Sequence, residues 1–235
     1  MNVLNKKALV LGGTSGIGLA AALQLKEQGA QVHVFGRSAD NLKSASEQGL
    51  HAHALDVLDR DAMSAAFASL APFDILVNAA TGGPRANGPF LKMDLDAYQA
   101  SFQKLWGYTN SVRLGAEHLT PQGCIVLVSG APARKPRPGS IALTSVGGAV
   151  EAFVRGMAAE LAPRRINVVS PGIIDTPMFA VSGDARQQFL TQATKNFLIP
   201  RPGSSEEVAQ AILFTITNDF VTGTTIDVDG GWLLS

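Results

Sequence analysis

The sequence predicts an α/β fold in which a doubly wound parallel sheet of about seven strands carries helices on both faces. Three observations lead to this prediction. Short apolar runs alternate with longer segments of helical periodicity along the whole chain. Several of these runs are almost continuously apolar, as is usual for strands that are covered on both faces. The 235 residues suit one domain, and no linker, internal repeat or low-complexity segment divides residues 1–235.

The strands are assigned to the apolar runs. These are 7–12, 31–36, 50–55, 73–78, 124–129, 166–170 and 224–228. The first, fourth and fifth runs ("KALVLG", "FDILVN" and "CIVLVS") are nearly uninterrupted, which indicates central strands. Since helical stretches lie between the runs, the strands are expected to be parallel, with right-handed crossovers.

The helices are assigned to the stretches between the strands, namely 16–28, 39–48, 59–70, 94–119, 143–162 and 205–217. Helices 94–119 and 143–162 are rich in Ala, Gly, Leu and Val, so they are expected either inside the subunit or against another subunit. Three segments are loop-rich: 82–89, 130–139 and 173–204. Because loops at the carboxyl ends of parallel strands carry binding function, these three are predicted to form the rim of a substrate pocket.

Composition excludes several classes of protein. Nineteen Lys and Arg balance nineteen Asp and Glu, which does not suggest nucleic acid as a partner. The single Cys124 lies in an apolar run and is expected to be a buried free thiol. His51 and His53 share one strand face, but no carboxylate or Cys completes a metal site. Without a signal pattern or an apolar run long enough for a bilayer, the protein is expected to be soluble and cytoplasmic.

The segment "VLGGTSGIG" (10–18) follows the first strand and opens the first helix. Gly12 permits the turn, and Gly16 and Gly18 allow the backbone to approach a pyrophosphate and the helix to pack closely on the strand. The N–H groups at the helix start then attract the phosphates. This context predicts a Rossmann-type dinucleotide site.

The end of the second strand selects between the two nicotinamide dinucleotides. An NAD-binding protein usually has an acidic residue there, which binds the ribose 2′-hydroxyl. Here the sequence is "VFGRS", so Arg37 and Ser38 stand at that position. A guanidinium pairs with a 2′-phosphate, and NADP(H) is therefore favoured over NAD(H).

Five segments in this order resemble the motifs of the short-chain dehydrogenase/reductase family. They are "LGGTSGIG" with Leu11 in place of the family's Thr, "ALDV", "DILVNAAT", "INVVSPGIIDTP" and "TGTTIDVDGGW". The resemblance covers nearly the whole chain and implies NADP(H) or NAD binding. The cofactor-binding residues that follow are Gly12, Thr14, Ser15, Gly16, Ile17, Gly18, Arg37, Ser38, Asp56, Val57, Asn78, Ala79, Ala80, Pro171, Gly172, Ile174 and Thr176. The family also implies a homodimer or homotetramer built on the helices matching 94–119 and 143–162.

The resemblance further implies a catalytic set of Asn, Ser, Tyr and Lys, and here the chain departs from the family. Alignment on "AVEAFVRGMAAELAP" places Gly130 at the Ser position, Leu143 at the Tyr position and Gly147 at the Lys position. "KLWG" places Lys104 at the Asn position. Both tyrosines, Tyr98 and Tyr108, precede the Ser strand, so no other register restores the usual proton donor.

Two residues are candidate substitutes for the missing acid. Lys104 is predicted to reach the vacated space, where a cationic nicotinamide would lower its pKa, although a solvated or structural lysine is the alternative. Ser129 ends a strand next to the lost Ser position, and packing there is its alternative role. The basic loop residues Arg134, Lys135 and Arg137 form either a solvated face or a site for an anionic substrate group.

Three functions remain open at this point. The first is an NADP(H)-dependent oxidoreductase that reduces or oxidises a small carbonyl- or alcohol-type substrate by a divergent mechanism. The second is a non-catalytic NADP(H)-binding sensor or partner subunit. The third is an enzyme without net redox chemistry, such as a lyase, isomerase or hydrolase, in which the nucleotide is a fixture.

Overall fold

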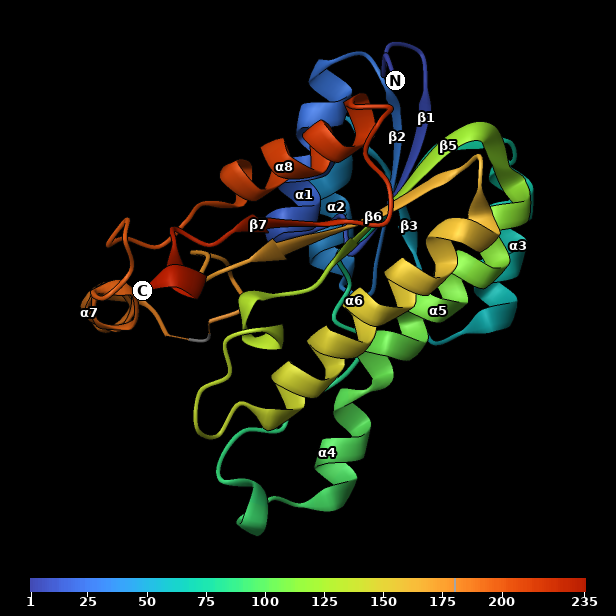
Figure 1. Cartoon of the computed structure of the whole chain (residues 1–235). Helices are drawn as coiled ribbons and strands as arrows, with labels where there is room; N and C mark the ends of the chain where they lie inside the picture. Colours follow the sequence, from blue (N-terminus) through green and yellow to red (C-terminus); the bar gives the residue numbers. More distant parts are fainter. Residues whose placement is uncertain (180) are drawn as a thin grey trace.

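The computed structural model describes residues 1–179 and 181–235 and contains the predicted parallel sheet of seven strands (Figure 1). The strand order is β3-β2-β1-β4-β5-β6-β7, with every neighbouring pair parallel. The strands are β1 (Lys7–Leu11), β2 (Gln31–Gly36), β3 (His51–Ala54), β4 (Phe73–Asn78), β5 (Leu119–Val128), β6 (Arg165–Pro171) and β7 (Thr225–Val228). The order reverses between β1 and β4, which is where open α/β sheets bind ligands.

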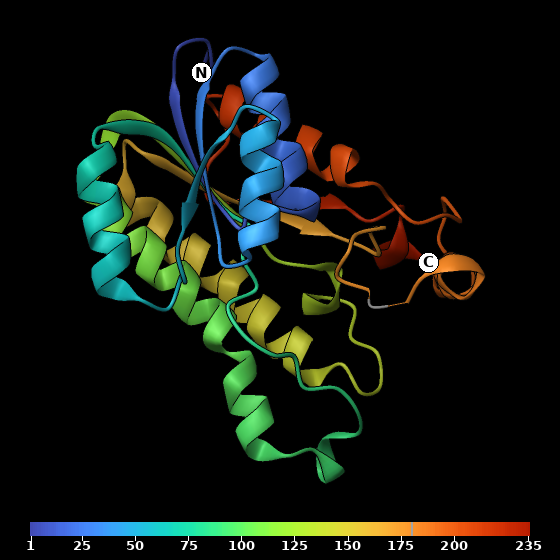
Figure 2. The same cartoon turned by 180° about the vertical axis from the view of Figure 1, so that it is seen from behind.

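Helices cover both faces of the sheet, as expected (Figures 1 and 2). One face carries α1 (Gly16–Glu27), α2 (Ala39–Glu47) and α8 (Ser205–Thr217), which bury Ala and branched side chains against the even-numbered residues of β1 and β2. The other face carries α3 (Arg60–Leu70), α5 (Gln103–Gly115) and α6 (Ile141–Leu161), which pack around Leu9, Leu76 and Leu127. The two apolar layers enclose the central strands completely.

The structure differs from the sequence-based prediction in three places. The helix expected over 94–119 is divided into α4 (Leu95–Ser101), α5 and a 3₁₀ turn, η2 (Ala116–His118), with Phe102 between the first two. The fifth strand begins at Leu119, where it pairs with Phe73, earlier than the apolar run. The region 173–204 contains a further helix, α7 (Gly183–Thr194), which its weakly periodic sequence did not indicate.

Among the described residues, helix α6 has the length and the apolar composition of a membrane-spanning helix. From the sequence, no such segment was expected. One face of this helix packs in the core. Val146, Val150 and Val154 lie buried against the sheet and α5. Since 33% of the apolar window is buried, packing against the sheet accounts for this face and not for the whole helix.

Three histidines form a stacked cluster on β2 and β3. The rings of His33 and His51 are 4.8 Å apart, and Nδ1 of His33 lies 3.0 Å from Nε2 of His53. One of the two facing nitrogens must be unprotonated to accept that hydrogen bond. Burial, followed by the neighbouring charges of His51, His53 and Lys7, lowers the pKa of His33 to about 4.

We expect this cluster to make stability depend on pH. Unfolded His33 takes up its proton near pH 6.5 and the folded residue only near 4, so the free energy of unfolding falls as pH drops through this window. Because the ring is only partly buried, solvent screening reduces the effect to about 1 kcal/mol. Urea unfolding of the wild type and of His33→Gln at pH 7.5 and 4.5 measures it. Carboxylates titrate in both proteins and affect both alike. If the free energy of unfolding changed equally with pH in the wild type and in His33→Gln, His33 would contribute nothing to the pH dependence.

Candidate functional site

The turn between β1 and α1 is closed by glycines that have no room for a side chain. Gly12 has φ +72°, and a Cβ there would lie 2.6 Å from the backbone nitrogen of Ala80. A Cβ on Gly18 would lie 2.1 Å from the carbonyl oxygen of Gly12. Gly12 therefore lets β4 approach the turn, and Gly18 lets α1 pack directly on it.

The start of α1 is open, in contrast to this tight packing. Ser15 is the N-cap, but its hydroxyl makes no capping hydrogen bond, so it leaves the first-turn N–H groups available. Gly16 has φ +51°, and a Cβ there would be in ordinary contact with Thr176, at 3.6 Å, and Pro177, at 3.9 Å. A helix start with free N–H groups and a glycine-lined approach fits the pyrophosphate of a dinucleotide.

An unsatisfied buried hydroxyl lies at the end of β6. Ser170 is completely buried, and its Oγ has no hydrogen-bond partner within the described part of the chain. It directly precedes Pro171 and Gly172, which the sequence assigns to the cofactor. A buried hydroxyl of this kind requires a polar partner, and a bound polar ligand or a water supplies one.

At the end of β2, Arg37 projects into solvent next to Asp56. Its Nη1 lies 3.5 Å from Oδ2 of Asp56, and both side chains are well exposed. Such a pair contributes little and leaves the guanidinium available for a phosphate. Ser38 accepts a hydrogen bond from the N–H of Asn41 and caps α2. Gly36 lies against Thr14, which brings the end of β2 to the glycine-rich turn.

Lys104 and Ser129 meet at the carboxyl end of the sheet. Lys104 lies in the first turn of α5, and its Nζ donates to the carbonyl oxygen of Ser129 at 3.4 Å. Part of the lysine remains accessible, but its amine lies among buried groups, over the ring of Tyr108. Burial, together with the positive charge of Arg85, lowers the pKa of Lys104 to about 7. The amine is therefore poised to exchange a proton near neutral pH.

The space around Gly147 is closed. The hydroxyl of Ser129 donates to the carbonyl oxygen of Gly147 at 3.2 Å, and a Cβ on Gly147 would lie 2.9 Å from Cβ of Ala133. A lysine at 147 would therefore have to displace the 3₁₀ turn η3 (Ala131–Ala133). Gly130 differs, because its extended backbone leaves 3.5 Å between an added Cβ and Pro132. A serine would fit there.

Arg85 is a site residue that the residue-by-residue reading of the sequence missed. It belongs to the loop after β4, and its Nη1 lies 2.8 Å from Sδ of Met178 in the loop after β6. Gly82 and Gly83 place this loop directly on the start of α5, because a Cβ on Gly82 would lie 2.9 Å from the nitrogen of Lys104. The sequence could have indicated Arg85 as a site residue, because it is an arginine in the segment 82–89 that was predicted to form the pocket rim.

Comparison with known proteins agrees with this architecture. The family model described as "Enoyl-(Acyl carrier protein) reductase" matches residues 12–233. A 3-oxoacyl-[acyl-carrier-protein] reductase of Aquifex aeolicus is 31% identical, with 96% of each chain covered. This chain belongs to the short-chain dehydrogenase/reductase family.

Other members of this short-chain dehydrogenase/reductase family are similar over their full length. The short-chain dehydrogenase/reductase malC of Malbranchea aurantiaca is 28% identical over 97% of this chain and 95% of the relative. A structure described as its reductase/Diels-Alderase has a TM-score of 0.90 at 27% identity, covering 99% of this chain and 98% of that one. A small-chain dehydrogenase in complex with NADPH has a TM-score of 0.85 at 30% identity, covering 98% and 100%.

Three of the predicted cofactor-binding residues of this short-chain dehydrogenase/reductase have side chains that stabilise the fold. The amide of Asn78 is buried and donates to Oγ of Ser111 at 2.9 Å, which ties β4 to α5. Val57 packs on Gly107, and Ile174 lies in the core next to α8. The side chains of these three residues are therefore engaged in packing or hydrogen bonding within the fold.

The two tyrosines hold structural hydrogen bonds. Tyr108 is buried and donates its hydroxyl to the carbonyl oxygen of Val128 at 2.8 Å. Burial raises its pKa, which makes it a poor proton donor. Tyr98 on α4 donates to Oγ of Ser145 on α6 at 3.0 Å.

The basic loop after Gly130 is held by the end of the chain. Arg134 pairs with Asp227 and, at 3.3 Å, with Glu151. Lys135 donates to the carbonyl oxygen of Trp232 at 2.9 Å, and Arg137 stacks on the Trp232 ring at 4.3 Å. The basic residues of this loop are therefore bound to other parts of the protein. This is a third role, besides the solvated face and the anion site considered from the sequence.

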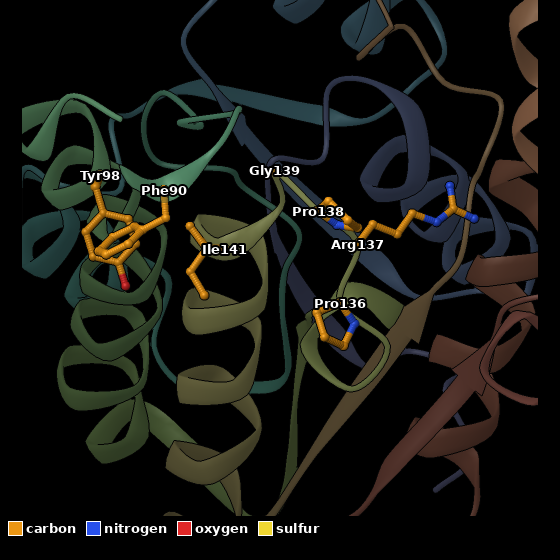
Figure 3. A pocket seen from close by; sticks show the side chains of 7 residues that line it. All are labelled: Phe90, Tyr98, Pro136, Arg137, Pro138, Gly139 and Ile141. Atoms are coloured by element: carbon orange, nitrogen blue, oxygen red, sulfur yellow. The ribbon is translucent and has the colours of Figure 1, made fainter. Parts of the chain in front are cut away.

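A cavity of about 420 Å³ lies between the predicted rim loop 130–139 and the segment of Phe90 and Tyr98 (Figure 3). Its lining residues are Phe90, Tyr98, Pro136, Arg137, Pro138, Gly139 and Ile141. The loops meet where the N–H of Gly88 donates to the carbonyl oxygen of Gly139. Neither Ser129 nor Lys104 lines this cavity, so it neighbours the candidate catalytic residues without containing them.

Proposed function

We propose that this protein is an NADP(H)-dependent oxidoreductase that interconverts a small carbonyl compound and its alcohol by a divergent mechanism. One observation carries the proposal: the uncapped start of α1, where Gly16 leaves room for no more than a Cβ in contact with Thr176. Arg37 at the end of β2 favours NADP(H), and the NADPH complex of a 30% identical relative supports the same preference.

When bound, NADPH supplies the hydride, and the chain must then provide a proton for the substrate oxygen. Lys104 is the proposed donor, since its pKa of about 7 keeps an ammonium partly populated at neutral pH. The contact between Ser129 and Gly147 holds the end of β5 against α6 and positions the carbonyl oxygen that accepts from Lys104. Gly130, Leu143 and Gly147 are proposed to replace the family's Ser, Tyr and Lys.

The same proposal extends to the assembly and the location of the protein. Trp106 on α5 is 62% exposed, although tryptophan is usually largely buried in a monomer. On α6, Gly148 and Gly156 have no neighbour within 4 Å of an added Cβ. We propose that these surfaces of α5 and α6 form a homodimer or homotetramer in the cytoplasm. Light scattering of the purified protein, with a dimer or tetramer mass expected, tests the assembly.

A second candidate is a reaction without net redox chemistry. The structural relative from Malbranchea aurantiaca is described as both a reductase and a Diels-Alderase, so one family member combines the two kinds of step. In this chain, however, Arg134 and Lys135 are engaged by internal partners, which removes part of the support for an anion-binding loop. Product formation with an unchanged nicotinamide spectrum would distinguish this candidate.

Two measurements test the principal proposal. Calorimetric titration should give tighter binding of NADPH than of NADH. Stopped-flow absorbance at the nicotinamide band, with a panel of ketones, enones and imines, should show oxidation of NADPH. Binding without oxidation of NADPH by any compound would favour the non-catalytic sensor or partner subunit. Absence of nucleotide binding would refute the proposal.

A further inference from the structure

Two cations lie together at the candidate catalytic centre without a counter-charge. The loop after β4 that carries Arg85 rests on the first turn of α5, which carries Lys104, and the charge of Arg85 acts on the lysine amine. In the described part of the chain, no carboxylate lies within salt-bridge distance of either one. The side chain of Arg85 instead contacts the sulfur of Met178, which is a weak acceptor.

Other arginines near the same end of the sheet have carboxylate partners. Arg134 pairs with Asp227, Arg186 with Asp175, and Arg201 with Glu207. Arg85 differs from them, although it is half-buried and burial lowers its pKa. A half-buried guanidinium without a carboxylate is a suitable partner for the negative charge of a ligand.

The loop that carries Arg85 is firmly held, so its position is built into the fold. A Cβ on Gly83 would overlap the side chain of Gln103, which shows how closely the loop packs on the start of α5. The N–H of Ala86 donates to Oγ of Ser101 at 2.9 Å. These contacts on both sides fix the backbone of Arg85 beside Lys104.

We propose that Arg85 binds a carboxylate of the substrate while Lys104 faces the neighbouring oxo or hydroxyl oxygen, so that the substrate is a small 2-oxo or 2-hydroxy acid. A planar guanidinium matches a carboxylate in geometry, and a lysine amine is suited to a single adjacent oxygen. This inference rests on the proposed function, because it places the carbonyl carbon where the hydride is delivered.

The pair also couples binding to protonation. Arg85 is the charged group that faces the amine of Lys104, and the Tyr108 ring and the Ser129 carbonyl are its other neighbours. A bound carboxylate offsets the charge of Arg85 and therefore raises the pKa of Lys104 from about 7. Binding of the acid near pH 7.5 then takes up protons, and Lys104 is charged when the substrate is in place.

The test compares oxamate, an unreactive analogue of a 2-oxo acid, with ethyl oxamate, which lacks the charge. Calorimetric titration of the NADPH-saturated protein at pH 7 should show oxamate binding at least about tenfold more tightly than the ester. Arg85→Gln should remove this advantage and Arg85→Lys should keep part of it. Arg113→Gln, which removes an exposed arginine of α5, should have no effect.

Proton uptake provides a second readout. Titration with oxamate at pH 7.5, in buffers of different ionisation enthalpy, should show proton uptake in the wild type and none in Lys104→Met. Equal affinity for oxamate and its ester, or unchanged oxamate binding in Arg85→Gln, would overturn the inference. So would tighter binding of inorganic phosphate than of oxamate, or a loss of NADPH affinity in Arg85→Gln as large as the loss for oxamate. The latter result would assign the pair to the cofactor phosphates.

Failure of this inference is distinguishable from failure of the proposed function. If NADPH binds and is oxidised but oxamate and its ester bind alike, the oxidoreductase assignment stands and the substrate class is wrong. If NADPH does not bind, the oxidoreductase assignment fails, and the oxamate titration of the free protein still decides whether Arg85 and Lys104 bind an anion.

Discussion

Replacing Gly16 with valine should weaken NADPH binding at least about 100-fold, which corresponds to about 2.7 kcal/mol. The Cβ of a valine would already touch Thr176, and its methyl groups would crowd the start of α1, where a pyrophosphate must approach the N–H groups. The left-handed backbone of Gly16, with φ +51°, also disfavours a branched residue. Fluorescence titration with NADPH measures the loss.

Gly49→Val is the matched control for this substitution. Gly49 also has a left-handed backbone, with φ +75°, but it lies in the turn after α2, where an added Cβ meets only the flexible end of Lys26. It should therefore lose stability through the same backbone strain and keep its NADPH affinity. Circular dichroism confirms that both variants are folded. Unchanged NADPH affinity in folded Gly16→Val would place the cofactor elsewhere.

Replacing Lys104 with methionine should lower kcat for carbonyl reduction by a factor of about 10²–10⁴, the usual contribution of a positioned general acid. The wild type should show kcat falling as pH rises above about 7, because reduction requires the ammonium form and the lowered pKa of Lys104 marks its loss. This limb of the pH profile should be absent in Lys104→Met. Steady-state kinetics between pH 5.5 and 9 measure both effects.

Two further variants separate proton donation from charge. Lys104→Arg keeps the positive charge but does not release a proton near neutral pH, so it should retain substrate affinity and lose kcat. Lys92→Met removes an exposed lysine of the 3₁₀ turn η1 (Phe90–Lys92) and should leave the profile unchanged. If Lys104→Met retained full kcat and the same pH limb, another group or water would be the proton donor.

The sequence by itself determined the architecture and the glycine-rich turn. Continuous apolar runs such as "CIVLVS" require burial on both faces, and their alternation with helical stretches leaves little choice except a parallel sheet. The spacing of Gly12 and Gly18 carried a strong signal, and the close contact of Gly18 with the carbonyl oxygen of Gly12 lies within the turn itself. Arg37 at the end of β2 could be identified in the same way, from its position after a strand.

The tertiary structure alone decided how the candidate catalytic groups are arranged. Whether Lys104 is solvated or buried depends on β5 and on the loop after β4, which are distant in sequence. Arg85 had no recognisable motif, and its proximity to Lys104 arises because Gly82 and Gly83 let one loop rest on the start of α5. The division of the helix over 94–119 at Phe102 likewise became visible only in the structure. Protonation and pairing depend on long-range burial and on charges brought together by folding, and local sequence patterns carry no record of either.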